Sequence, residues 1–159
     1  MILVREASAA DVALILSFIR ELAEYERLSH EVVATEDGVR ESLFGERPYA
    51  EVLIAEHDGS PAGFALFFHN YSTFLGRPGI YLEDLYVRPE FRGAGIGKKL
   101  LVRLARLARS RGCGRLEWWV LDWNEPSIGF YEKLGAVPMD DWTVYRVSGP
   151  ALEDLASGS

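Results

Sequence analysis

The stretch RPEFRGAGIGKKL, Arg88–Leu100, decides the fold and the kind of site that this sequence predicts. It places Gly93, Gly95 and Gly97 at alternate positions, between a strand-like run (GIYLEDLYV, Gly79–Val87) and apolar residues at helical spacing. Glycine at this density favours a backbone that a ligand approaches closely. A helix that begins after such a loop presents N–H groups and the positive end of its dipole to an anion. The stretch therefore predicts a phosphate-binding loop.

Two common phosphate-binding loops are excluded by their spacing. The dinucleotide pattern G-x-G-x-x-G would need glycine in place of Lys98. The P-loop pattern would need one more residue between the outer glycines, and Ser or Thr in place of Lys99. A nucleotide-binding module is therefore disfavoured, and the pattern that remains is R-x-x-G-x-G, from Arg92 to Gly97.

Length and composition limit the class of protein. The chain has 159 residues, of which 48% are hydrophobic and 26% charged, as expected of one globular domain. Its net charge of −7 disfavours nucleic-acid binding and favours cationic ligands. The single cysteine, Cys113, excludes an internal disulfide, and His30, His57 and His69 lack metal-ligand spacing, so no metal is expected. With no signal-peptide pattern and no long apolar run, we expect a cytoplasmic protein without a membrane partner.

Periodicity and turn residues predict a mixed α/β chain. Strands are expected at Ile2–Glu6, Ala50–His57, Ala62–Asn70, Gly79–Val87, Arg115–Leu121 and Thr143–Val147. Helices are expected from a cap at Ser8 through Leu22, over Asp37–Phe44, from Ile96 to the turn SRGCG, and from Asn124 to Gly135. Only the later part alternates strand and helix, which predicts a mixed sheet rather than a doubly wound one. We expect one domain over residues 1–159, with a frayed tail over 150–159.

Three motifs together resemble one family. The R-x-x-G-x-G pattern, between a strand ending in LYV and an amphipathic helix, resembles the acyl-CoA pyrophosphate loop of the GCN5-related N-acetyltransferases (GNAT). WNEPSIGFYEKLGA, Trp123–Ala136, is similar to that family's other CoA-contacting segment. YLEDLYV, WNEPSIGFY and ELAEYERL (Glu21–Leu28) resemble the diamine acetyltransferase subgroup, which includes the spermidine/spermine N1-acetyltransferases. The resemblance implies a mixed, mostly antiparallel central sheet flanked by helices, and a homodimer.

The resemblance also implies acetyl-CoA as the cofactor. The strand from Leu85 to Val87 would lie along the pantetheine arm, with an oxyanion-binding N–H near Leu85, and the glycine loop would surround the pyrophosphate. The implied cofactor-binding residues are Leu85, Tyr86, Val87, Arg92, Gly93, Ala94, Gly95, Ile96, Gly97, Lys98, Asn124, Pro126, Ser127 and Tyr131.

Acetyl transfer to an amine needs a neutral amine and a proton for the departing thiolate. Glu83, in the strand that leads to the thioester end, is the candidate base, or the residue that positions the amine, directly or through a water. Tyr131 is the candidate acid, because a phenol with a pKa of about 10 can protonate a thiolate. Tyr131 follows Asn124 by about two helical turns, so the two share a helix face. We expect direct attack by the amine in a ternary complex.

Acidic and aromatic side chains suit a small cationic substrate through charge pairing and cation–π contact. The resemblance implies a diamine, a polyamine or a lysine-like amino acid. The implied substrate-binding residues are Tyr25, Glu26, Glu83, Glu117, Trp118, Trp119 and Asp141, with Asp140 as an alternative to Asp141. Acetylation of a protein or peptide and a non-catalytic acyl-CoA sensor remain alternative functions.

Overall fold

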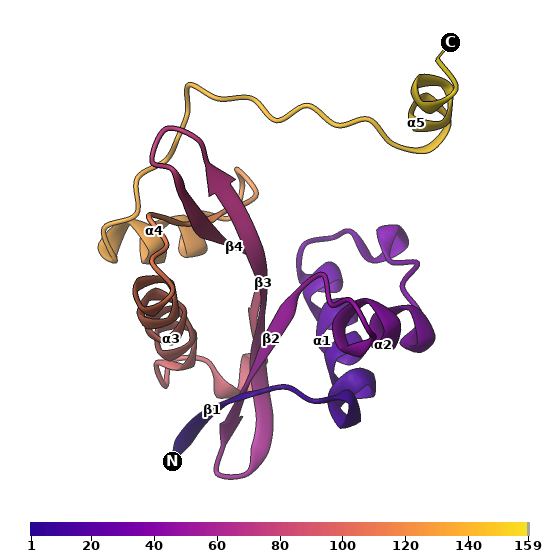
Figure 1. Ribbon diagram of the computed structural model, residues 1–159. Coiled ribbons are helices and arrows are strands. Elements are labelled where there is room, and N and C mark those ends of the chain that lie inside the picture. The colour runs from indigo at the N-terminus through magenta and orange to yellow at the C-terminus, as the bar shows by residue number, and fades with distance from the viewer. Residues whose placement is uncertain (159) are drawn as a thin grey trace. The chain divides into compact units, whose positions relative to one another are not determined.

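A computed structural model describes residues 1–158, and Figure 1 shows its elements. The strands are β1 (Ile2–Glu6), β2 (Glu51–His57), β3 (Ser60–Ser72), β4 (Arg77–Val87) and β5 (Leu116–Trp118). The α-helices are α1 (Val12–Tyr25), α2 (Glu36–Phe44), α3 (Ile96–Ser110), α4 (Glu125–Lys133) and α5 (Gly149–Ala156). Short 3-10 turns lie at Ala9–Asp11, Ser29–Glu31 and Pro89–Phe91. The chain forms two compact units, which divide between Leu121 and Asp122.

The strands form one sheet in the order β1-β2-β3-β4-β5. The pairs β1–β2, β2–β3 and β3–β4 are antiparallel and the pair β4–β5 is parallel, which confirms the mixed, mostly antiparallel sheet. At the β2–β3 turn, Asp58 and Gly59 both have positive φ (49° and 84°), as expected for an Asp-Gly hairpin. The parallel β4–β5 pair requires a crossover, which α3 provides.

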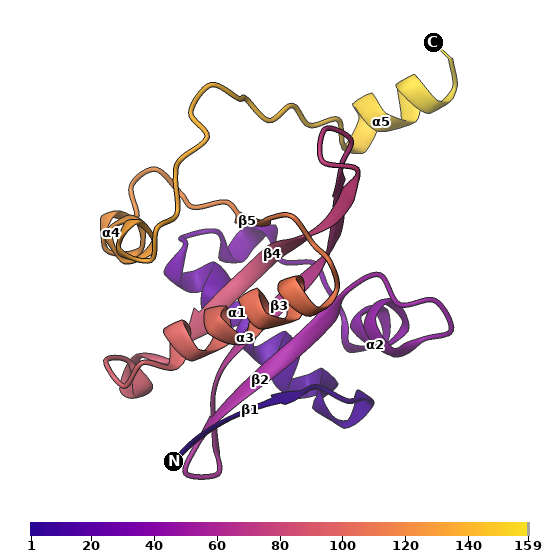
Figure 2. The ribbon, with the colours of Figure 1, turned by 60° about the vertical axis from the view of Figure 1, so that its left-hand side comes forward.

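Helices cover both faces of this sheet. Helices α1 and α2 lie on one face and α3 on the other, as Figures 1 and 2 show. On the α1 face, the rings of Phe18 and Phe64 stack with centroids 5.2 Å apart. On the α3 face, Ile96, Leu100 and Leu104 are buried at one-turn intervals. Burying each such side chain contributes about 1.5–3 kcal/mol, so the amphipathic helices are fixed mainly by these contacts.

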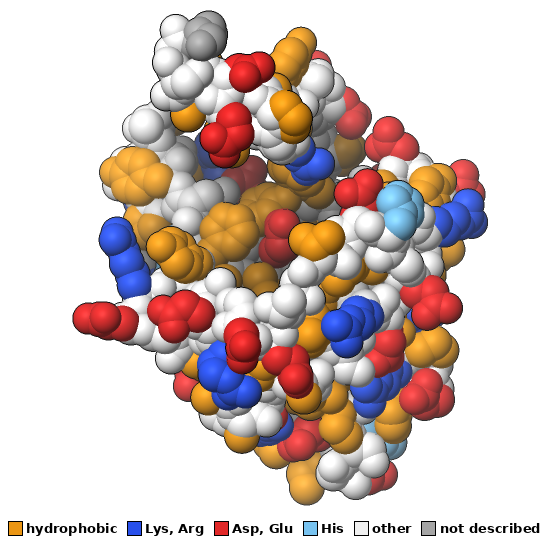
Figure 3. Space-filling view, turned by 90° about the vertical axis from the view of Figure 1, so that its right-hand side faces the viewer, with side chains coloured by type: hydrophobic (Ala, Val, Ile, Leu, Met, Phe, Trp, Pro, Cys, Tyr) orange, Lys and Arg blue, Asp and Glu red, His pale blue; other side chains and the backbone are white. Residues whose placement is uncertain are grey.

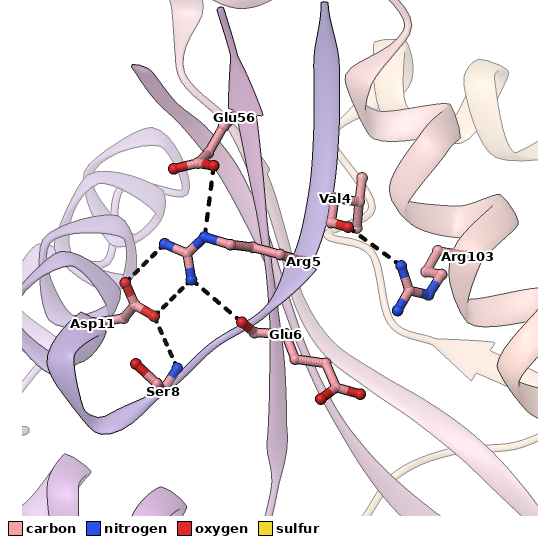
Figure 4. A network of polar contacts seen from close by, with 7 residues as sticks. All are labelled: Val4, Arg5, Glu6, Ser8, Asp11, Glu56 and Arg103. Atoms are coloured by element: carbon pink, nitrogen blue, oxygen red, sulfur yellow. Dashed lines mark hydrogen bonds and ion pairs between the residues drawn. The ribbon is translucent and has the colours of Figure 1, made fainter. Parts of the chain in front are cut away.

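A polar network joins β1 to the start of α1 (Figure 4). Arg5 donates two hydrogen bonds to Asp11, at 2.8 and 2.9 Å, and its Nε lies 3.6 Å from Glu56. The Asp11 carboxylate also accepts from the Ser8 N–H at 2.8 Å, in a capping box that confirms Ser8 as the cap of the turn leading into α1. Hydrogen bonding from Arg5 holds the pKa of Asp11 below its ordinary value despite burial. On the other face, Arg103 of α3 bonds the backbone of β1.

The C-terminal part differs from the sequence prediction. Residues Thr143–Val147, predicted as a strand, are irregular, because a strand requires a neighbour to pair with and these residues lack one among residues 1–158. Helix α5 occupies the tail that was expected to be frayed, with Pro150 in its first turn, where proline is favourable. Strand β5 is also shorter than the predicted Arg115–Leu121.

The face of the protein on the side of α1 and α2 is mixed in charge. The view onto the α1 and α2 side in Figure 3 shows Asp and Glu side chains interspersed with Lys, Arg and apolar ones. Across residues 1–158, no helix is both long and apolar enough to cross a membrane.

Candidate active site

Strand β4 carries the predicted base, and its pairing with β3 shifts at that residue. Leu66 pairs with Asp84, whereas the next residue, Phe67, pairs with Leu82, so Glu83 is the extra residue of a β-bulge. Directly opposed residues of antiparallel strands share a face, so Asp84 shares the α1 face with Leu66. Strict alternation would have placed Asp84 on the α3 face with Leu82, which is 2% exposed. The bulge therefore removes a carboxylate from the core on the α3 face.

The edge of β4 that faces β5 opens at the same point. Strand β5 pairs with β4 only at Ile80–Leu82, so within residues 1–158 the segment 83–87 has no strand partner on that edge. Backbone N–H and C=O groups on an open edge can pair with an extended ligand that carries amides. Leu85, Tyr86 and Val87 lie on this segment, and the Tyr86 side chain is buried toward α1. The backbone groups of these residues are therefore accessible for the predicted contact with pantetheine.

The glycine loop lies between β4 and α3, as predicted. Gly93 and Gly95 adopt left-handed φ values of 87° and 85°, and Gly95 is the N-cap of α3. A Cβ at either position would meet nothing within 4 Å, so the backbone conformation, and not crowding, requires glycine. A glycine cap supplies no side-chain acceptor to the first N–H groups of the helix.

The charges around the start of α3 favour an anion there. The first turn, residues 96–99, contains Lys98 and Lys99 and no acidic residue. Lysines are unfavourable at the positive end of a helix dipole unless an anion is near. The uncapped N–H groups and the two lysines therefore fit a ligand such as a pyrophosphate.

Arg88 fixes the chain just before this loop. Its guanidinium donates two hydrogen bonds of 3.0 Å to Glu21 on α1 and one of 3.2 Å to the Pro61 carbonyl, and it lies 4.7 Å above the Phe18 ring. Burial raises the pKa of Glu21, but the hydrogen bonds and charge of Arg88 outweigh that effect, and the pKa lies below its ordinary value. The end of β4 is thereby attached to α1.

Three carboxylates at or near the bulge, those of Glu26, Glu83 and Asp84, interact through their charges. Burial, and then the charges of Glu83 and Glu26, raise the pKa of Asp84 to about 7. Burial and the charge of Glu83 also raise the pKa of Glu26, the C-cap residue of α1. Such a cluster favours a cation, which relieves the repulsion. The predicted residues Glu26 and Glu83 thus interact electrostatically, and Asp84 interacts with both.

An aromatic group continues the site along β4. The Tyr81 ring makes an edge contact with Trp119 (centroids 5.8 Å apart) and a tilted contact with Phe68 (5.2 Å). Burial, and then the charges of Glu83, Glu117 and Asp84, raise the pKa of Tyr81. The predicted residues Glu117 and Trp119 therefore lie near Tyr81. Sequence reasoning missed Tyr81, although its position two residues before Glu83 was a usable signal.

Strand β5 carries two of the predicted substrate-binding residues, Glu117 and Trp118. Glu117 accepts a 3.2 Å hydrogen bond from Asn70, and Trp118 pairs with Leu82 in the parallel register. Among residues 1–158, no group of three or more His, Cys, Asp or Glu side chains is arranged to hold a metal ion.

The second unit, from Asp122 onward, contains the predicted residues that follow Leu121 in the sequence. Asn124, 5% exposed, caps α4 by accepting from the Ser127 N–H at 3.4 Å, which confirms the predicted start of the helix. Pro126 lies in the first turn, and Tyr131 lies further along the same helix beside Phe130. The exposed Asp140 and Asp141 lie in the chain beyond α4. Their roles toward cofactor and amine stay predictions.

Relatives of this chain agree on one family. Residues 17–136 match the model of the "Acetyltransferase (GNAT) family". A thialysine N-epsilon-acetyltransferase from Bos taurus is 42% identical, over 98% of this chain and 97% of its own. An L-ornithine N5-acetyltransferase from Arabidopsis thaliana is 34% identical, over 96% of this chain and 86% of its own. A solved integron cassette protein from V. cholerae has a TM-score of 0.81 at 28% identity, over 98% of this chain and 97% of that one. The chain belongs to the GNAT family of acetyltransferases, which confirms the resemblance.

The raised pKa of Asp84 predicts a pH-dependent stability. Between the ordinary value of 3.8 and about 7, native Asp84 holds a proton that the unfolded chain has lost, so its contribution to stability falls as pH rises. We expect Asp84→Asn to raise the free energy of unfolding at pH 8 by roughly a few kcal/mol relative to wild type, and far less at pH 4. Urea unfolding followed by tryptophan fluorescence measures both. Glu83→Gln removes a charge that repels Asp84, so in this variant the fall in stability with pH should occur at a lower pH than in wild type. An equal effect of Asp84→Asn at both pH values would contradict the assignment.

Proposed function

We propose that this protein transfers the acetyl group of acetyl-CoA to a primary amine of a small cationic substrate, by direct attack in a ternary complex. A lysine-like amino acid or a diamine is the preferred acceptor. The observation that carries the proposal is the carboxylate cluster of Glu26, Glu83 and Asp84, next to the open edge of β4. The names of the relatives point the same way, because thialysine and ornithine are amino acids with an amino side chain.

The GNAT family uses acetyl-CoA as its acetyl donor, and several features of this chain suit that cofactor. Residues 92–98 would hold the pyrophosphate at the uncapped start of α3, and the backbone of 85–87 would hold the pantetheine arm. Asn124, Pro126 and Ser127 are proposed as further contacts. When bound, acetyl-CoA supplies the thioester carbonyl that the amine attacks, and a backbone N–H near Leu85 would stabilise the oxyanion.

Two adjacent carboxylates are proposed to act on the amine, which arrives protonated because its pKa is near 10. Glu83 is proposed as the base or positioning group, since it is the exposed residue of the bulge. Asp84 has a pKa of about 7, which suits a proton acceptor at neutral pH. Glu26 adds charge that attracts the cation, and Glu117, Trp118, Trp119 and Asp141 are proposed as further substrate contacts.

The two carboxylates can be separated by their pH profiles. We expect Glu83→Gln to lower kcat/KM for the amine by about 100-fold, the lower range for loss of a general base. We expect Asp84→Asn to remove the rise of kcat/KM through about pH 7 that ionisation of Asp84 produces. The KM for acetyl-CoA serves as the control and stays near the wild-type value. Wild-type profiles and amine KM values in both variants would exclude these residues.

Tyr131 is proposed as the acid that protonates the departing thiolate. We expect Tyr131→Phe to lower kcat by about 100-fold, because it removes the proton donor and keeps the ring. Binding of acetyl-CoA, measured by calorimetry, should change little. Tyr145→Phe is the matched control, since Tyr145 is 92% exposed in the same unit. Full turnover in Tyr131→Phe would remove this residue from the mechanism.

The direct test of the function is thiol release from acetyl-CoA with a panel of amines. The panel contains lysine, thialysine, ornithine, putrescine, spermidine, spermine and a short peptide, with butylamine as a matched amine that lacks a second charge. We expect the largest kcat/KM with a lysine-like amino acid or a diamine, and a much smaller value with butylamine. Preference for the peptide would support the peptide-acetyltransferase alternative. Cofactor binding without thiol release would support the sensor.

A homodimer and a cytoplasmic location complete the proposal. The resemblance implies the dimer, and the second unit exposes apolar side chains that an interface could bury, among them Trp142 at 75% and Val144 at 59% exposure. The single free cysteine suits a reducing compartment. We propose no nucleic-acid or membrane partner, because the net charge is −7.

A further inference from the structure

Arg92, the first residue of the R-x-x-G-x-G pattern, lies over two tyrosine rings. Its guanidinium carbon lies 5.2 Å from the centroid of Tyr25, the last residue of α1, and 5.8 Å from that of Tyr86 on β4. Its Nε donates a 2.9 Å hydrogen bond to the Val87 carbonyl. Three contacts from two different elements thus fix an otherwise exposed side chain next to Gly93.

We propose that Tyr25 is a positioning residue for the cofactor loop: by stacking on Arg92 it strengthens binding of the pyrophosphate of acetyl-CoA, and it does not contact the amine. The inference rests on the proposed function, in which residues 92–98 hold that pyrophosphate. It changes the role that the resemblance implies for Tyr25, which is contact with the amine.

The stack lowers the entropic cost of using Arg92. A free arginine side chain loses much rotamer freedom when it binds a ligand, and a side chain that is already ordered loses less. Tyr86 is a rigid partner, because it is 6% exposed and its ring contacts Phe18. Tyr25 is 37% exposed and covers Arg92 from α1. Because Nε of Arg92 donates to the Val87 carbonyl, the N–H groups of the two terminal guanidinium nitrogens are the donors that suit a phosphate.

Tyr25 and its neighbour Glu26 have surroundings of opposite charge. Glu26 interacts with the carboxylates of Glu83 and Asp84, where a cation is favoured. Tyr25 instead lies against a guanidinium, and a second cation at the same ring would be repelled. The two adjacent residues at the end of α1 therefore serve different ligands, Glu26 the amine and Tyr25 the cofactor loop.

Calorimetry of CoA binding without amine tests the inference. We expect Tyr25→Leu to raise the Kd about two- to fivefold, the value of one exposed cation–π contact. Tyr25→Phe keeps the ring and should restore the wild-type Kd. Tyr49→Leu removes a tyrosine that is 72% exposed and outside the site, and should have no effect. Thermal unfolding of each variant checks that the fold is kept.

A truncated donor separates positioning from a general loss of structure. With acetyl-CoA, kcat/KM for the donor should fall in Tyr25→Leu by the same factor as the affinity, while the amine KM stays unchanged. With S-acetylpantetheine, which lacks the pyrophosphate, Tyr25→Leu and wild type should be equal. An unchanged Kd for CoA, a raised amine KM, or an equal loss with both donors would overturn the inference alone. Failure of the wild-type protein to bind CoA would overturn the proposed function and the inference with it.

Discussion

Strand β4 accommodates one residue more than β3 at the step from Leu66 to Phe67, and the candidate site depends on that extra residue. Because Glu83 bulges out, Asp84 shares the α1 face instead of pointing into the apolar layer under α3. The parallel pairing with β5 ends one residue earlier, at Leu82. In the proposed function, the same short segment therefore presents carboxylates to the amine and an open backbone edge to the extended cofactor.

Two kinds of carboxylate contrast in this protein, those paired with arginine and those that repel one another. Charges that stabilise the fold are paired, as in Arg5 with Asp11 and Arg88 with Glu21, and these pairs lower the pKa of each carboxylate. The carboxylates beside the bulge repel one another, and the pKa of Asp84 is raised. Repulsion between unpaired charges costs folding free energy in the free protein and becomes useful when a cation binds. This contrast with the structural ion pairs supports the proposed binding of a cation by the carboxylate cluster.

Helix α1 connects the two parts of the site in the first unit. Its last two turns supply Glu21 to Arg88 and Tyr25 to Arg92, and its C-cap residue is Glu26 of the carboxylate cluster. The helix is itself fixed by apolar contacts of Val12, Ile15 and Phe18 against the sheet. The placement of polar groups at the loop and at the bulge thus depends on burial of the apolar residues of the same helix.

The sequence by itself determined the features that depend on consecutive residues. The glycine loop, the Asp-Gly hairpin and the caps at Ser8 and Asn124 are set by backbone conformations that only a few residue types adopt, and all were predicted. The motifs in these segments were also sufficient to indicate the family.

Only the tertiary structure decided the features that depend on neighbours. The bulge at Glu83, the stack of Tyr25 on Arg92 and the contact of Tyr81 with Trp119 join residues whose relation follows from register and packing. The predicted strand over Thr143–Val147 was wrong for the same reason. A β-strand exists only where another strand satisfies its hydrogen bonds, and no local pattern of residues supplies that partner.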